Sequence, residues 1–161
     1  MRQIRKIGQL VIDLELNLTS LDELGLLNLL GRIFRELRRR GTIRTDSFTA
    51  EIGEYWAKNL LDLELAQTGT PGMDATKGDV RYQIKTRRIY PGAKSTRSTR
   101  RVPDTHIGEY DHLLLVILEE FFACTEIWQT PRSAFKGETD VTVKWIQDNP
   151  ASKKIWPETA G

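Results

Sequence analysis

The sequence predicts an α/β fold, or an α+β fold with segregated helices, and three observations predict it. Two segments, 20–40 and about 47–61, carry apolar residues at helical spacing. Several shorter segments alternate apolar and polar residues or form short apolar runs, as strands do. The chain has 161 residues, of which 39% are hydrophobic and 29% charged, and this composition suits one soluble globular domain with a substantial core.

The first forty residues predict a strand followed by a helix. In residues 9–18, leucine and isoleucine alternate with polar residues, which is the period of a strand with one apolar face. Ser20 and Glu23 have the spacing of a helix capping box, and Gly41 is placed to end the helix. The helix carries its apolar stripe on Leu27, Leu30, Phe34 and Leu37.

The rest of the chain predicts a second helix and then a sheet. The helix is expected from about Ser47 to Leu61. Strands are expected at 63–67, 73–76, 80–87, "HLLLVILEE" (112–120) and "FACTEIWQT" (122–130). Residues 88–108 are rich in Ser, Thr and Arg and are expected to be irregular. The tail predicts one strand, Val141 to Ile146, and otherwise a loose end.

Composition favours a soluble cytoplasmic protein. The single cysteine, Cys124, cannot form an internal disulfide, which fits a reducing compartment. No signal peptide is expected, because Asp13 and Glu15 interrupt the early apolar run. No apolar stretch approaches the length of a membrane span, so no membrane partner is expected. The net charge of +2 leaves the choice of partner open.

One predicted strand has a polar face that suggests chemistry. In "GMDATKGDVRYQIKTRR", the even-numbered residues Val80 to Ile84 share an apolar face, and Gln83 and Lys85 lie on the other. The Lys-Gly-Asp turn before this strand folds it back and brings Asp74 across from Gln83 and Lys85. Carboxylate and amide oxygens are ligands that magnesium takes, and a lysine beside them holds or polarises water. The pattern favours metal-assisted hydrolysis of a phosphodiester.

The second helix offers a further acid for this site. Glu54 shares a helical stripe with Ala50, Ala57 and Leu61, and the small residues let the helix lie close to a sheet. A glutamate in that stripe is expected to be partly buried, and it then needs a partner such as a metal or a cation. Glu51 points to another side and is expected to be solvated. A solvated glutamate or an ordinary salt bridge remains the alternative for Glu54.

The order of these residues resembles the PD-(D/E)xK nuclease superfamily and is similar to small restriction or homing endonucleases. The matching features are the helical Glu54, Asp74 in "GMD", and Gln83 and Lys85 in "QIK". The resemblance implies a restriction-endonuclease-like core, with a mixed central β-sheet flanked by helices and an added N-terminal strand and helix. The single domain 1–161 would then consist of an N-terminal extension (1–45), a catalytic core (46–130) and a C-terminal element (131–161).

The resemblance also implies a magnesium-dependent endodeoxyribonuclease in which Mn²⁺ substitutes for Mg²⁺. Its catalytic residues would be Glu54, Asp74, Gln83 and Lys85. Asp74 and Gln83 would hold the metal, with Glu54 bound directly or through water and the backbone carbonyl of Ile84 completing the shell. Lys85 would orient the attacking water and offset charge in the transition state. Gln83 stands where an acid is usual, which lowers the ligand charge by one.

A basic segment without acids, "KTRRIYPGAKSTRSTRR" (85–101), follows the proposed site. A mobile loop of this composition suits contacts with DNA phosphates, and a solvated charge run is the alternative. The residues expected to bind DNA are Arg87, Arg88, Lys94, Arg97, Arg100 and Arg101. A second run of arginines, 38–40, is explained by the C-terminal end of its helix, which favours cations.

The expected partner is double-stranded DNA. Cutting both strands calls for two subunits, so a homodimer or larger homo-oligomer is expected, with the helix 20–40 and the strand 9–18 as candidate contacts. Two alternatives stay open: a DNA-binding protein of the same fold that has lost catalysis, and an RNA-directed nuclease. Gln83 as ordinary exposed strand surface is the corresponding alternative for the site.

Overall fold

The computed structural model describes residues 18–40, 48–67, 70, 72–90, 101–105 and 107–157. Its helices and strands are η1 (Leu18–Ser20), α2 (Glu23–Arg39), α3 (Thr49–Leu61), β1 (Glu64–Leu65), β2 (Ala75–Lys77), β3 (Val80–Arg88), β4 (Arg101–Val102), β5 (His112–Leu118), β6 (Cys124–Pro131), η2 (Arg132–Phe135), β7 (Val141–Thr142), α5 (Val143–Asp148) and β8 (Lys153–Trp156). None of the described helices is long and apolar enough to span a bilayer.

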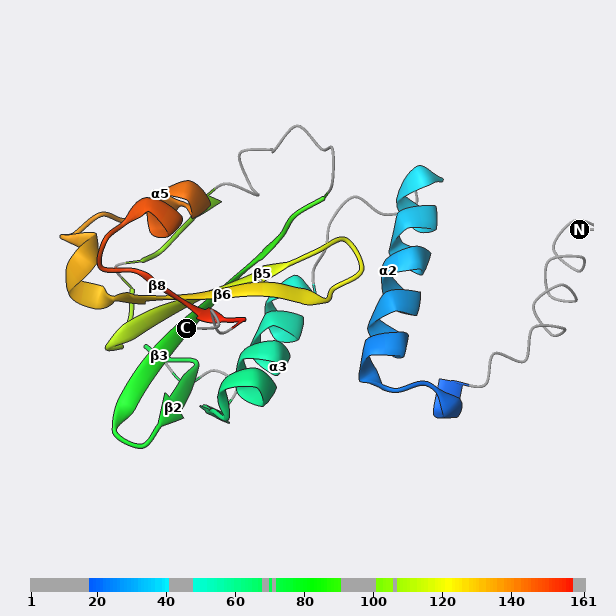
Figure 1. Cartoon of the computed structure of the whole chain (residues 1–161), viewed down its shortest axis with the longest axis horizontal. Helices are drawn as coiled ribbons and strands as arrows, with labels where there is room; N and C mark the ends of the chain where they lie inside the picture. Colours follow the sequence, from blue (N-terminus) through cyan, green and yellow to red (C-terminus); the bar gives the residue numbers. More distant parts are fainter. Residues whose placement is uncertain are drawn as a thin grey trace, which may run out of the picture.

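The centre of the molecule is a mixed six-stranded sheet with the order β1-β2-β3-β5-β6-β8 (Figure 1). β3 is antiparallel to β2 and parallel to β5, and the remaining neighbours in this sheet pair in antiparallel fashion. Two neighbouring parallel strands must be joined by a crossover connection. Residues 89–111 are the part of the chain that joins β3 to β5. A second, two-stranded sheet joins β4 to β7. The predicted mixture of helices and strands is therefore confirmed.

Both faces of the sheet are covered, which explains the apolar run of β5. All residues of β5 after His112 are buried, because alternate side chains enter two different cores. α3 covers one face and α5 lies against the other (Figure 1). The α3 core contains Ile52, Ala57, Leu63, Ala75, Ile84, Leu114, Val116, Leu118, Phe122 and Ile127. The α5 core contains Val102, Tyr110, Leu113, Leu115, Ile117, Phe135, Val141, Val143 and Ile146.

α2 packs against the α3 core through Leu27, Leu30 and Phe34, which confirms most of the predicted apolar stripe. The predicted capping box on Ser20 is wrong. The N-cap is Asp22, whose Oδ1 accepts the N–H of Gly25 at 2.8 Å, while Ser20 belongs to η1. The predicted strand 9–18, apart from Leu18 in η1, and the predicted helix stop Gly41 lie outside the described residues.

The predicted strand from Val141 to Ile146 is also wrong, since β7 ends at Thr142 and α5 follows. Thr142 caps this helix by accepting the N–H of Trp145 at 3.0 Å. Val143 and Ile146 are both buried at the i, i+3 spacing of one helix face. The tail is more ordered than predicted, because β8 pairs with β6 at the end of the sheet.

Several residues outside the predicted site have structural positions. Cys124 is a free, partly buried thiol, and burial raises its pKa to about 12. His112 begins β5, and His106 lies outside the described residues. Trp128 and Trp145 pack against the α5 core.

Candidate active site

Asp74 lies at the edge of β3, one residue before β2 begins. The register of the hairpin pairs Ala75 with Tyr82, which places Asp74 opposite Gln83. Oδ2 of Asp74 accepts the backbone N–H of Ile84 at 2.6 Å and the side-chain amide of Gln83 at 2.5 Å. The carboxylate therefore takes the place that a strand residue would have in the hydrogen-bond ladder. The structure brings Asp74 and Gln83 together as the predicted hairpin requires.

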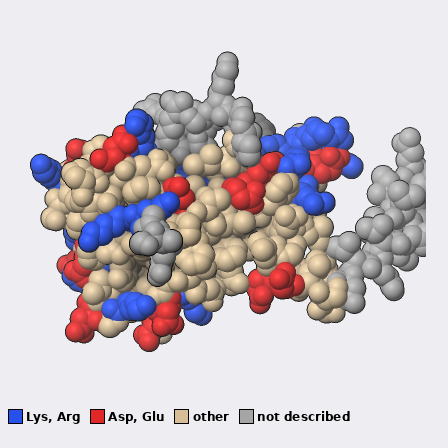
Figure 2. All heavy atoms as spheres, viewed as in Figure 1, with Lys and Arg blue, Asp and Glu red and all other residues tan. Residues whose placement is uncertain are grey.

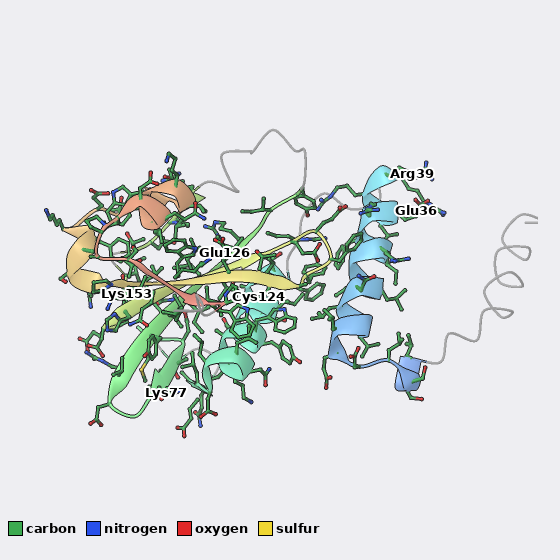
Figure 3. All side chains as sticks on the ribbon, in the orientation of Figure 1. Glu36, Arg39, Lys77, Cys124, Glu126 and Lys153 are labelled. Carbon is green, nitrogen blue, oxygen red and sulfur yellow. The ribbon has the colours of Figure 1, made fainter. Side chains whose placement is uncertain are left out.

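The geometry depends on a tight hairpin turn. Gly78 and Asp79 connect Lys77 to its partner Val80, and Gly78 has a φ of 58°. A positive φ at the first central residue suits a two-residue hairpin turn, and glycine adopts it without strain. Lys77 then ties the hairpin to α3, because its Nζ donates to the carbonyl of Leu61 at 2.7 Å (Figure 3).

Lys85 lies on the same face of β3 as Gln83, two residues along, and both side chains are partly buried. Burial raises the pKa of Asp74, whereas the N–H of Ile84 and the positive charge of Lys85 act in the opposite direction. The ammonium group therefore lies within electrostatic reach of the carboxylate. The structure thus places an acid, an amide and a lysine at one point of the sheet, as predicted.

α3 brings Glu54 to the same region. Glu54 is partly buried, and burial raises its pKa, with further increases from the negative charges of Asp74 and Glu51. The two carboxylates of Glu54 and Asp74 are therefore close enough to repel each other. Glu51 is exposed, as predicted.

The predicted cause of the close approach of α3 to the sheet is only partly right. Ala57 is buried in the α3 core, whereas Ala50 is exposed and takes no part in the contact. The contact is made by Gly53, where an added Cβ would lie only 1.8 Å from Oγ1 of the buried Thr86 in β3. No other residue type fits at position 53 unless the helix or the strand moves. Gly53 thus sets the distance between Glu54 and the sheet. This role of Gly53 was not predicted from the sequence.

The donor set suits a hard cation. Carboxylate oxygens come from Asp74 and Glu54, and amide oxygen from Gln83. In an antiparallel ladder the N–H and C=O of a residue point to the same neighbouring strand. The Ile84 N–H bonds Asp74, so the Ile84 carbonyl also points to that side. Among the described residues no group of three or more Asp, Glu, His or Cys could hold a metal, so a cation here requires the amide and carbonyl oxygens as well.

The basic residues predicted to bind DNA divide into two groups. Lys94, Arg97 and Arg100 lie outside the described residues. Arg87 is partly buried and donates to the carbonyl of Arg101, and Arg101 pairs with Asp140. The expectation that Arg88 belongs to a mobile loop is wrong. It ends β3, is 5% exposed and donates to the carbonyl of Glu120.

The run of arginines 38–40 was explained from the sequence by the end of the helix alone, and its clustering with Arg35 was not predicted. Figure 2 shows Lys and Arg gathered at that end of the helix. The helical spacing of Arg35, Arg38 and Arg39 indicates that they share one face. The helical spacing could have predicted that these arginines lie together, but it does not identify the strand that faces them.

No protein-family model and no curated protein matches the sequence.

Proposed function

We propose that this chain is a metal-dependent DNA endonuclease of restriction or homing type, with a restriction-endonuclease-like core. The observation that carries the proposal is the meeting of Asp74, Gln83 and Lys85 at the edge of β3, with Glu54 approaching from α3. Asp74 contacts Gln83, lies near Lys85 and interacts electrostatically with Glu54. These residues come from a helix, a loop and a strand, so no single local pattern explains the arrangement around Asp74. Their resemblance to the PD-(D/E)xK nuclease site is the reason for choosing phosphodiester hydrolysis over other metal chemistry.

Each residue has a defined task in this proposal. Bound Mg²⁺ would polarise the scissile phosphate and lower the pKa of a bound water. Asp74 and Glu54 hold the cation by charge, and Gln83 and the Ile84 carbonyl add neutral oxygens. In the structure the amide nitrogen of Gln83 contacts Asp74. Rotating the amide group by half a turn places its oxygen there instead, where it can bind the cation. Lys85 orients the attacking water and offsets the charge that develops on the phosphate oxygens.

Two further parts of the proposal concern partners. The substrate is double-stranded DNA, and Arg87, Arg101 and residues of 91–100 contact its backbone. The active form is a homodimer or larger homo-oligomer, because each subunit supplies one site. Leu24 and Ile33 of α2 are 47% and 48% exposed, which supports this helix as a contact surface.

One observation favours the second candidate, a DNA-binding protein of the same fold without catalysis. Gln83 replaces an acid, so among the described residues Asp74 and Glu54 are the two carboxylates proposed to bind the metal. Nicking of supercoiled plasmid by the purified chain in Mg²⁺, with EDTA as the control, separates the two functions. Nicking that depends on the metal supports the enzyme, whereas retention of plasmid without nicking in Mg²⁺ and in Mn²⁺ supports the binding protein. An RNA substrate in parallel tests the RNA-directed alternative.

Substitutions of Gln83 test its role as a ligand. Gln83→Glu keeps the shape but places a third carboxylate against Asp74, which already has a raised pKa from burial. We expect this variant to melt at a lower temperature than wild type in EDTA, to gain more stability from Mg²⁺, and to retain cleavage. Gln83→Ala removes the oxygen, and we expect it to lose most activity at limiting Mg²⁺. Equal, small effects of the two substitutions on melting and cleavage would mean that Gln83 is ordinary strand surface.

The raised pKa of Glu54 gives a pH-dependent prediction. Because the folded state holds the Glu54 proton more tightly than the unfolded state, the free energy of unfolding falls as pH rises through the raised pKa. Glu54→Gln removes this loss. In EDTA we expect the variant to melt above wild type at neutral pH, and the difference to vanish well below pH 4.5, the ordinary value for glutamate.

Thermal melts from acid to neutral pH measure this difference, and the matched control is Glu64→Gln at an exposed position of β1. Added Mg²⁺ should reverse the order of the two melting temperatures, so that wild type melts above Glu54→Gln. The cation stabilises the folded state of wild type through Glu54 and has less effect on the variant. A Glu54→Gln protein that melts below wild type at neutral pH in EDTA would show that Glu54 has a stabilising cationic partner within the protein.

A further inference from the structure

A cavity of about 310 Å³ lies between α2 and the end of β3, away from the Asp74 site. Its lining consists of Arg35, Arg38, Arg39, Arg88, Tyr90 and Glu120, named here the arginine pocket. Four arginines and one glutamate thus line one space. Figure 2 shows this end of α2 as a gathering of basic side chains with a few acidic ones beside it.

The arginines of the pocket are held in place before any ligand arrives. Arg35 pairs with Glu120 at 2.6 Å and lies over the ring of Phe121. Arg38 donates to the hydroxyl of Tyr90 at 2.9 Å. Arg39 pairs with Glu36 at 2.7 Å at the end of α2 (Figure 3). Side chains that are already ordered lose little conformational entropy when they bind.

Arg88 forms the floor of the pocket. It is 5% exposed, its Nε donates to the Glu120 carbonyl at 3.1 Å, and its guanidinium lies 3.8 Å from the centre of the Phe122 ring. Tyr90 lies close to two cations, because the guanidinium carbons of Arg88 and Arg38 are 4.9 and 5.3 Å from the centre of its ring. A buried cation in surroundings of low dielectric attracts an anion more strongly than one in water.

The chemistry and size of the arginine pocket select one class of ligand. Planar guanidinium groups match the oxygens of phosphates and carboxylates in pairs of parallel hydrogen bonds. Several arginines around one space favour phosphate, whose oxygens point in several directions and carry more charge. The volume of about 310 Å³ lies at the lower end of the range for small-ligand sites, and it admits a phosphate with part of the molecule that bears it.

We propose that the arginine pocket is a phosphate-binding site. The phosphate belongs either to a DNA backbone or to a small molecule such as a mononucleotide, and in both cases it replaces Glu120 as the partner of Arg35. The site is separate from the candidate active site, since Arg88 lies three residues beyond Lys85 on β3, roughly 10 Å along the strand. It therefore does not depend on the proposed nuclease activity.

The test is a titration of the full chain with inorganic phosphate, followed through the arginine side-chain NMR signals, in low-salt buffer. We expect Arg38→Gln to weaken phosphate binding about tenfold or more, because it removes a charge-assisted donor. Arg32→Gln is the matched control, since it removes the same charge from the exposed surface of α2 outside the pocket. Glu120→Gln should strengthen binding, because it removes the carboxylate that competes for Arg35.

Binding of generic duplex DNA at several salt concentrations identifies the source of the phosphate. If a backbone phosphate enters the pocket, Arg38→Gln lowers the slope of log affinity against log salt by about one, and Arg32→Gln does not. If inorganic phosphate binding is lost while the DNA slope is unchanged, the ligand is the phosphate of a small molecule. Equal weakening by Arg38→Gln and Arg32→Gln, or no phosphate binding by wild type, overturns the proposal. Neither the phosphate titration nor the DNA-binding measurement depends on cleavage. The test therefore remains valid if the nuclease proposal fails.

Discussion

Lys85→Ala is expected to lower the rate of Mg²⁺-dependent DNA cleavage by at least about 100-fold, the cost typical of removing one group that stabilises transition-state charge. Lys85 lies beside Asp74 on the polar face of β3, outside both apolar cores. The fold should therefore survive the change. Asp74→Asn should have an equally large effect, because asparagine still accepts the Ile84 N–H but supplies no charge for the metal. Rates of plasmid nicking measure both losses.

The matched control for this prediction is Lys58→Ala. Lys58 is an exposed lysine of α3, so the substitution removes the same charge without touching the site. Circular dichroism and thermal melting establish that each variant is folded before its rate is compared. Near wild-type cleavage by either Lys85→Ala or Asp74→Asn would falsify the catalytic assignment.

Gly53→Ala is expected to have the largest effect on stability. The new Cβ would lie 1.8 Å from Oγ1 and 2.7 Å from Cβ of Thr86, so α3 has to move away from β3. Overpacking of this kind costs about 1–3 kcal/mol or more, against about 1 kcal/mol gained from the higher helix propensity of alanine. We expect a net loss of about 1–2 kcal/mol in the free energy of unfolding, and a loss of cleavage because Glu54 moves with the helix. Urea denaturation and nicking measure the two losses.

Two further variants separate the clash from other effects of Gly53→Ala. Ala50→Gly, at an exposed position of the same helix, measures the propensity difference alone. Thr86→Ala removes two of the three clashing atoms, and within the described part of the chain Oγ1 of Thr86 has no hydrogen-bond partner to lose. The double variant Gly53→Ala/Thr86→Ala should therefore recover part of the lost stability. No recovery would mean that the clash is not the cause.

The sequence predicted the hairpin and its polar cluster because both depend on short-range rules. Alternation fixes which side chains of β3 share a face, and a two-residue turn after Lys77 fixes the register that brings Asp74 to Gln83. The buried run of β5 was predictable for a similar reason, since a strand between two cores reads as continuously apolar.

Features that depend on distant contacts were not predictable. The segment Val141–Ile146 fits the period of a strand and of a short helix, and the cap by Thr142 decides between them. The role of Gly53 appears only once Thr86 is placed beneath it. The arginine pocket joins α2 to the end of β3 and to Glu120, and no local pattern links positions so far apart in the sequence.

We propose that Asp74, Gln83, Glu54 and the Ile84 carbonyl together hold a divalent cation. The most direct measurement is an anomalous diffraction map from crystals grown with Mn²⁺, collected at the manganese absorption edge. The proposal predicts one peak beside Oδ2 of Asp74, about 2 Å from the nearest carboxylate oxygen and within coordination distance of the Ile84 carbonyl. A well-ordered site without a peak at saturating Mn²⁺, with Gln83 still donating to Asp74, would contradict it.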